Sequence, residues 1–154
     1  MKYLSKNRIN AYADITGGKN NADLGGRVTF ISLDDGVLVT AKIWGLPEEN
    51  EGGFFGFHIH EGNSCTGEAF ANTGAHYNPG GKPHPEHSGD LPPLLSADGG
   101  AYLSVFTNRF RVEEIVGKTV VIHNMADDFR SQPSGEAGEK IGCGVIVHAR
   151  GRKH

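Results

Sequence analysis

Short β-branched runs bounded by glycine-rich turns constrain the fold of this 154-residue chain more than any other feature. Within residues 37–44, the side chains of Val37, Val39, Ala41 and Ile43 alternate with a more mixed set, so they are expected to face a core from one strand. Similar strands are expected over residues 11–15, 27–31, 54–60, 101–106, 118–123 and 143–148. The sequence of residues 109–116 is ambiguous and is compatible with a helical turn. None of the longer segments has helical periodicity. The pattern predicts an all-β sandwich or barrel, with loops 61–100 and 124–142 providing the function.

Length and composition fit one domain spanning residues 1–154. The 23 glycines and the 37% share of hydrophobic residues indicate many turns around a modest core. The net charge of −3 argues against a nucleic-acid-binding protein, because such proteins are usually strongly basic. The basic tail at residues 150–154 is too short to change that expectation and is interpreted as a solvated end. No apolar run is long enough to cross a bilayer, so no membrane partner is expected.

The first eight residues are polar and contain no hydrophobic stretch of the kind found in secretory signals. A cytoplasmic location is therefore expected from the sequence as given. A periplasmic or extracellular location stays open, since removal of a leader would leave the same start.

Metal-capable side chains are concentrated between residues 58 and 90. A strand has a side-chain period of two, so His58 and His60 would point to the same face. Four more follow in a segment rich in glycine and proline: His76, His84, His87 and Asp90. Such a cluster favours an imidazole-rich transition-metal site over a proton-transfer triad. Coordination would also order a long loop that shows no pattern of its own.

The chain has two cysteines, Cys65 within this segment and Cys143 near the C-terminus. A disulfide between them would close a long loop and stabilise the fold by roughly 4 kcal/mol on the chain-entropy model. Two unrelated buried thiols fit the residues equally well. Taken by themselves, the residues leave this choice open.

From about residue 9 to residue 149, the chain resembles copper–zinc superoxide dismutases of the bacterial type. The motifs are Gly-Phe-His-Ile-His ending at His60, Ala-His-Tyr-Asn-Pro around His76, His-Ser-Gly-Asp ending at Asp90, and Val-Val-Ile-His ending at His123. A lone His-X-His pair is weak evidence, whereas all of these motifs in the family's order are specific. The resemblance implies an eight-strand Greek-key β-barrel, an immunoglobulin-like sandwich, with two long functional loops.

The resemblance also implies two ligand sets and a disulfide. Copper would be bound by His58, His60, His76 and His123. Zinc would be bound by His76, His84, His87 and Asp90, so that His76 bridges the two ions. Asp127 matches the carboxylate that links a copper histidine to a zinc histidine. Cys65 and Cys143 match the family's disulfide within one subunit.

The activity implied by the resemblance is dismutation of superoxide to dioxygen and hydrogen peroxide, with copper and zinc as cofactors. His76 would take up a proton in the reduced state and deliver it to the product. Lys140 stands where the family has an arginine; it keeps the attraction for an anion but lacks the planar two-donor fork. Arg130 is a less direct candidate for the same task. A homodimer is left open, because family members differ in their dimer faces.

A non-catalytic module that binds copper or zinc is the alternative function. The presence of the four copper-side histidines favours the enzyme, since losing any of them would favour the module. Other residues have ordinary interpretations: His148 and His154 lie outside the pattern, Phe54, Phe55 and Phe57 would pack in the core or on a strand face, and Asp128 would pair with a cation in its loop.

Overall fold

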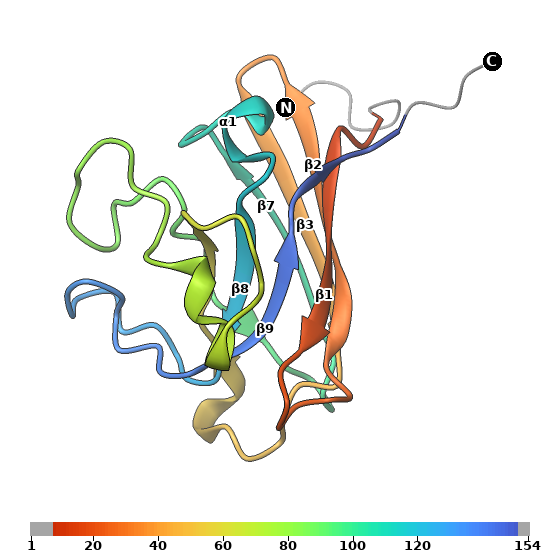
Figure 1. Cartoon of the computed structure of the whole chain (residues 1–154), viewed down its shortest axis with the longest axis vertical. Helices are drawn as coiled ribbons and strands as arrows, with labels where there is room; N and C mark the ends of the chain where they lie inside the picture. Colours follow the sequence, from red (N-terminus) through yellow and green to blue (C-terminus); the bar gives the residue numbers. More distant parts are fainter. Residues whose placement is uncertain (1–7, 151–154) are drawn as a thin grey trace.

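The computed structural model describes residues 8–150 as an antiparallel sheet curled into a barrel (Figure 1). The sheet runs in the order β5–β8–β9–β1–β2–β3–β7, and β10 also pairs with β1. Its strands are β1 (Ala11–Gly17), β2 (Gly25–Leu33), β3 (Gly36–Trp44), β5 (Phe57–His60), β7 (Ala101–Thr107), β8 (Thr119–His123), β9 (Lys140–Val145) and β10 (Val147–His148). Pairing of the first strand with β9 requires the crossing connections of a Greek key. The predicted eight-strand Greek-key barrel is confirmed.

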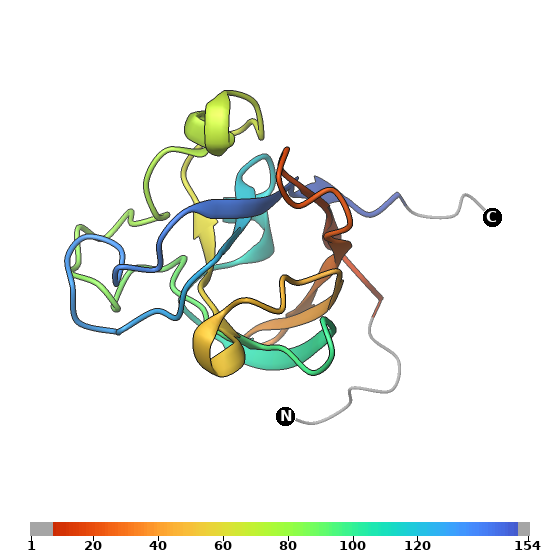
Figure 2. The same ribbon diagram turned by 90° about the horizontal axis from the view of Figure 1, so that it is seen from below.

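A two-stranded ribbon connects the two ends of this sheet. It consists of β4 (Phe54–Phe55) paired with β6 (Leu94–Leu95). β4 leads almost directly into β5, and β6 leads through a tight turn into β7, so the ribbon lies between the two edge strands. Seen from below, the strands surround a common interior, and the long loops extend from one side of it (Figure 2).

One hydrophobic cluster fills that interior, with side chains contributed by every long strand. In β3, Val37, Val39, Ala41 and Ile43 are at most 4% exposed, as their alternation predicts. Trp44, on the opposite face, is 59% exposed. Burial of alternate residues along β3 therefore fixes which face of the sheet becomes the core.

Two of the predicted strands are interrupted. Residues 54–60 divide at Gly56, whose N–H donates to the Met125 carbonyl and whose carbonyl accepts from His123 N–H. A Cβ at Gly56 would lie 2.7 Å from Ala137 Cβ, so a glycine is needed at this close approach. Phe54, before the break, is 41% exposed rather than packed in the core, whereas Phe55 and Phe57 are fully buried.

The predicted strand at residues 143–148 begins earlier, at Lys140, and divides at Ile146. The N–H of Ile146 donates to the Lys118 carbonyl, and its carbonyl accepts from Gly117 N–H. This change of partners moves the chain from β9 into β10.

The remaining elements are short. They are η2 (Glu51–Gly53), η3 (Glu68–Thr73) and α1 (Val112–Ile115), the last of which is the helical turn left open by the sequence. Loop 61–100 thus contains η3 and β6 rather than no structure at all. Within residues 8–150, no helix is long and apolar enough to cross a membrane. The polar start at residues 1–7 and the basic tail after Arg150, including His154, lie outside the described residues.

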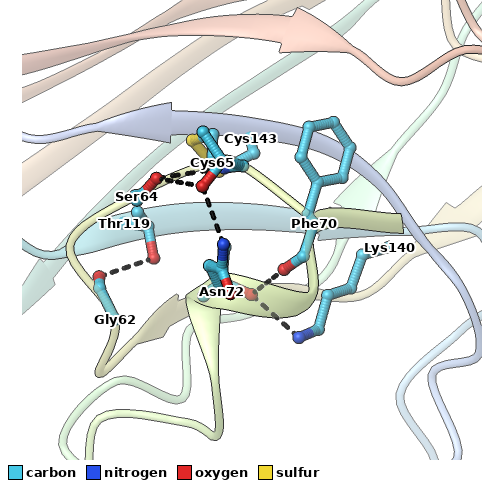
Figure 3. Close-up of a disulfide and its surroundings, with 10 residues drawn as sticks. Gly62, Ser64, Cys65, Phe70, Asn72, Thr119, Lys140 and Cys143 are labelled. Carbon is cyan, nitrogen blue, oxygen red and sulfur yellow. Dashed lines mark hydrogen bonds between the residues drawn. A yellow bond between two sulfur atoms is a disulfide. The ribbon is translucent and has the colours of Figure 1, made fainter. Parts of the chain in front are cut away.

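A disulfide joins Cys65 in loop 61–100 to Cys143 on β9, with 5.8 Å between the two Cα atoms. Figure 3 shows it above the short helix η3, with Lys140 reaching toward the same loop. The pairing implied by the family resemblance is confirmed. The loop is therefore attached covalently to the barrel.

Candidate metal centre

Strand β5 positions the centre, because it contains His58 and His60 and lies at the edge of the sheet. Its free edge is lined by loop residues: Asp90 forms an isolated bridge with His58, and His76 forms one with His60. Between them, Tyr77 N–H donates to the Ile59 carbonyl at 2.8 Å. Backbone hydrogen bonds therefore place loop histidines beside strand histidines.

The first group consists of four buried histidines whose ligand nitrogens all lie within 4.8 Å of one another: His58, His60, His76 and His123. His60 Nδ1–H donates to the Gly74 carbonyl at 2.8 Å, and His123 Nδ1–H donates to the Gly138 carbonyl at 3.1 Å. Each Nε2 atom is then an acceptor, and the two Nε2 atoms face each other at 3.2 Å. Two acceptors this close require a cation or a proton between them.

The second group shares His76 with the first and consists of His76, His84, His87 and Asp90, with ligand atoms again within 4.8 Å. The Asp90 carboxylate lies 2.8 Å from His76 Nδ1 through Oδ1. Its Oδ2 lies 3.0 Å from His84 Nδ1 and 3.2 Å from His87 Nδ1. Three imidazoles thus converge on one carboxylate. The structure brings together every metal-ligand candidate that the sequence analysis named.

Asp127 connects the two groups. Its Oδ2 accepts from His58 Nε2–H at 2.7 Å, and its Oδ1 accepts from His84 Nε2–H at 2.8 Å. Oδ1 also accepts from Phe129 N–H. Gly135 packs against this carboxylate with a φ of +70°, and a Cβ there would lie 2.1 Å from Oδ1. Only glycine fits at this position.

Three buried ring nitrogens have no hydrogen-bond partner within residues 8–150: His58 Nδ1, His76 Nε2 and His84 Nδ1. The last lies 3.0 Å from Asp90 Oδ2 but without hydrogen-bond geometry. Buried polar atoms are normally satisfied, so three buried nitrogens without a hydrogen-bond partner in one place fit a role as ligands of cations. A set of four imidazoles suits copper, and a set of three imidazoles with one carboxylate suits tetrahedral zinc. The residues fit both ions.

Burial keeps the rings of His58, His60 and His123 neutral. It lowers the pKa of His58 from 6.5 to about 4, that of His123 to about 3 and that of His60 to about 2. Burial alone would raise the pKa of Asp127, but hydrogen bonds from His58, His84 and the Phe129 amide outweigh it and lower that pKa. Neutral imidazoles beside a charged carboxylate are the protonation states that metal binding needs.

The same shifts predict how the metal-free protein responds to acid. His58, His60 and His123 have folded-state pKa values below their ordinary 6.5, so the unfolded state binds more protons below that pH. The free energy of unfolding is expected to fall as the pH drops from about 6.5 to 4, each ring contributing up to about 1.4 kcal/mol per pH unit. Urea unfolding of metal-free, disulfide-intact protein at several pH values measures this. The exposed His148 provides the control, as His148→Gln should leave the slope unchanged; a flat profile over this range would contradict the expectation.

A pocket of about 390 Å³ opens onto the first group, and its lining includes His60, His76, His123 and Lys140. Lys140 Nζ donates to Thr73 Oγ1 at 2.8 Å and to the Gly74 carbonyl at 3.1 Å. Burial lowers the pKa of Lys140 below its ordinary 10.5. Arg130, the second candidate for attracting an anion, is not among the residues that line this pocket.

The sequence analysis missed the partners that hold these groups. Thr73 has no signal in the sequence, and the carbonyls of Gly74 and Gly138 have none because every residue has a carbonyl. Asp128 was assigned wrongly: its carboxylate accepts from the backbone N–H groups of Arg130 and Ser131 and from the Ser131 hydroxyl. It caps the turn that follows it instead of pairing with a cation.

Comparisons with known proteins agree with this geometry. The model of the copper/zinc superoxide dismutase (SODC) family matches residues 24–146. "Superoxide dismutase [Cu-Zn] 2" of Aquifex aeolicus is 36% identical over 136 residues, which are 79% of this chain and 78% of that protein. The superoxide dismutase [Cu-Zn] of Deinococcus radiodurans is 32% identical over 142 residues, 79% of this chain and 76% of that protein. A crystal structure of a double mutant of a SOD-like protein from Bacillus subtilis superposes with a TM-score of 0.74 at 29% identity, covering 88% of this chain and 96% of that one. The chain belongs to the copper/zinc superoxide dismutase family.

Proposed function

We propose that copper is bound by His58, His60, His76 and His123, and that zinc is bound by His76, His84, His87 and Asp90. The observation that supports this most is that the two groups share His76, while His58 Nδ1, His76 Nε2 and His84 Nδ1 are buried without partners. The protein is a superoxide dismutase with copper and zinc as its cofactors. Two superoxide anions and two protons give dioxygen and hydrogen peroxide.

Copper bound by the first group would supply the one-electron couple for this reaction, and zinc bound by the second group would supply a fixed positive charge without redox chemistry of its own. The chain itself holds the rings in place. The carbonyls of Gly74 and Gly138 fix the tautomers of His60 and His123, so that each presents Nε2 to the centre. Asp127 does the same for His58, which then presents Nδ1.

His76 is the group proposed to move the proton. Its Nδ1 faces the second group, 2.8 Å from Asp90 Oδ1, while its Nε2 faces the first group without a partner. The ring also lines the pocket that a small anion would enter. A proton held at Nε2 can therefore pass to the peroxide as it forms.

Copper-dependent superoxide decay tests this function directly. Protein loaded with one copper and one zinc is compared with zinc-only protein, with the metal content measured in both. We expect decay far above that of buffer only when copper is present. Absence of such decay from protein with demonstrated bound copper would overturn the proposal and favour a module that only binds metal.

Lys140 is proposed to attract superoxide, because a positive charge at the mouth of the pocket focuses the local field despite the net charge of −3. Lys140→Glu is expected to lower the bimolecular rate by about tenfold or more at low salt, with normal metal content. The control is Lys42→Glu, which makes the same charge change on an exposed residue of β3. Stopped-flow decay at several ionic strengths measures both. Equal effects of the two variants would show that only net charge matters.

Asp127 is proposed to orient one ring of each metal group. In Asp127→Asn, an amide N–H₂ would face one ring N–H, so one imidazole would lose its acceptor. Zinc affinity is expected to fall by about 10- to 100-fold, which competition with a chelator measures. Asp128→Asn, one residue away, should leave zinc affinity unchanged. An unchanged affinity in Asp127→Asn would contradict the orienting role.

A further inference from the structure

The Lys140 ammonium is held by two consecutive residues of one loop, and one of them is a threonine buried to 0% exposure. The hydroxyl of this residue, Thr73, donates to the Phe70 carbonyl at 2.8 Å. Its hydrogen is therefore committed, and its oxygen is left to accept from Lys140 Nζ at 2.8 Å. The Thr73 hydroxyl oxygen is therefore fixed both in position and in the direction from which it accepts a hydrogen bond.

The segment that contains Thr73 is itself anchored to the barrel. Cys65 binds it covalently to β9, and Thr119 on β8 donates from Oγ1 to the Gly62 carbonyl at 3.1 Å. Figure 3 shows these anchors on one side of η3, with Lys140 approaching from the other. On the other side of Thr73, Gly62 N–H donates to the Thr73 carbonyl and Glu61 N–H donates to the Ala75 carbonyl, both at 2.8 Å. Because the segment is attached on both sides of Thr73, the acceptors of Lys140 have little freedom to move.

A lysine depends on such acceptors more than an arginine does. Its charge is compact and lies at the end of a flexible four-carbon chain, whereas a guanidinium is a rigid fork with several donors. Two of the three ammonium N–H groups are committed to Thr73 and Gly74, which leaves one uncommitted at the pocket. Holding the charge in one place keeps the field at the pocket mouth high.

We propose that Thr73 is a positioning residue, which holds the Lys140 ammonium at the pocket and so sets the rate at which superoxide is captured. The inference rests on the anion-attracting role proposed above for Lys140. It adds that the threonine hydroxyl replaces the geometric stiffness that an arginine would bring. Thr73 acts through Lys140 and touches neither substrate nor metal.

The test compares superoxide decay at low salt for copper- and zinc-loaded variants with measured metal content. Thr73→Val removes the hydroxyl at nearly constant shape and is expected to lower the rate about threefold and to weaken its salt dependence. Thr73→Ser and Thr73→Ala form a second matched pair that differs only in the hydroxyl, so the test survives if the valine variant does not fold. Serine should retain the rate, and alanine should lose it.

Two substitutions of Lys140 test whether the effect of Thr73→Val passes through the ammonium. With Lys140→Gln, which alone should lower the rate about tenfold, Thr73→Val is expected to add nothing. With Lys140→Arg, the guanidinium supplies its own donors, and Thr73→Val is expected to cost less than it does beside lysine. A further readout is the ¹⁵N NMR order parameter of the Lys140 ammonium in copper(I)- and zinc-loaded protein. It should fall in Thr73→Val and stay unchanged in Thr73→Ser.

The outcomes separate this inference from the proposed function. A drop with Lys140→Gln and no change with Thr73→Val would overturn the inference while leaving the role of Lys140 intact. An equal drop from Thr73→Val with and without Lys140 would also overturn it, because the effect would not pass through the ammonium. No drop with Lys140→Gln would overturn the role of Lys140 and the inference together.

Discussion

His76→Ala is expected to lower the rate of superoxide dismutation by roughly 10²- to 10⁴-fold, the range that a positioned proton donor contributes. The reason is that His76 belongs to both side-chain groups and is the only residue that they share. Its loss removes one of four nitrogens from the first group and one of four ligand atoms from the second. It also removes the ring proposed to deliver a proton to the product.

Metal content and turnover are measured on the same His76→Ala samples. Chelator competition should show weaker zinc binding. Zinc affinity reports only the loss of the ligand, whereas turnover also reports the loss of the proton carrier. His148→Ala removes an exposed histidine outside both groups and should retain full activity. A His76→Ala protein that binds both metals normally and turns over at the normal rate would show that His76 only packs.

Removal of the disulfide is expected to lower the free energy of unfolding by about 4 kcal/mol, because the bond closes a loop between residues 78 positions apart. Urea unfolding of metal-free protein with and without a reductant measures this, since bound metal would add its own stabilisation. Cys143 is 1% exposed, so alanine is preferred to serine at that position to avoid a buried hydroxyl.

The control for this experiment is a protein with both Cys65→Ala and Cys143→Ala. It should show the reduced stability from the start and should not respond to the reductant. A change below about 1 kcal/mol on reduction of the natural protein would mean that the unfolded chain is already compact, so that closing the loop costs it little entropy.

Much of the fold could be predicted because the alternation of apolar and polar residues along a strand indicates which side chains are buried. In β3, the residues expected to face the core do so, and the strand begins within one residue of the expected position. The breaks at Gly56 and Ile146 could not be predicted, since both depend on hydrogen bonds to segments far along the chain, around Met125 and Lys118. The ribbon strand β6, only two residues long, has too few residues to show a period.

The centre was predictable for a different reason. Its side chains are chemically conspicuous, and their motifs are specific in combination. Every ligand that the resemblance named therefore falls into one of the two groups, and Asp127 lies beside them. The supports around them are not conspicuous, because Thr73, Gly135 and two backbone carbonyls acquire a role only through position. A homodimer and a cytoplasmic location stay predictions.

The loop that ends at Lys140 alternates between residues that face the centre and residues that face solvent. Gly135 and Ala137 are buried against Asp127 and Gly56, while Pro133, Glu136 and Glu139 are exposed. Of the outward residues, Pro133 also forms the pocket wall, together with Ser134 and Gly138. The charge and shape of the entrance can therefore be altered by substitution at outward positions without disturbing the carboxylate that orients the rings. One short segment thus keeps the reactivity of the centre and the selectivity of its entrance separable, so each can be engineered or can diverge without the other.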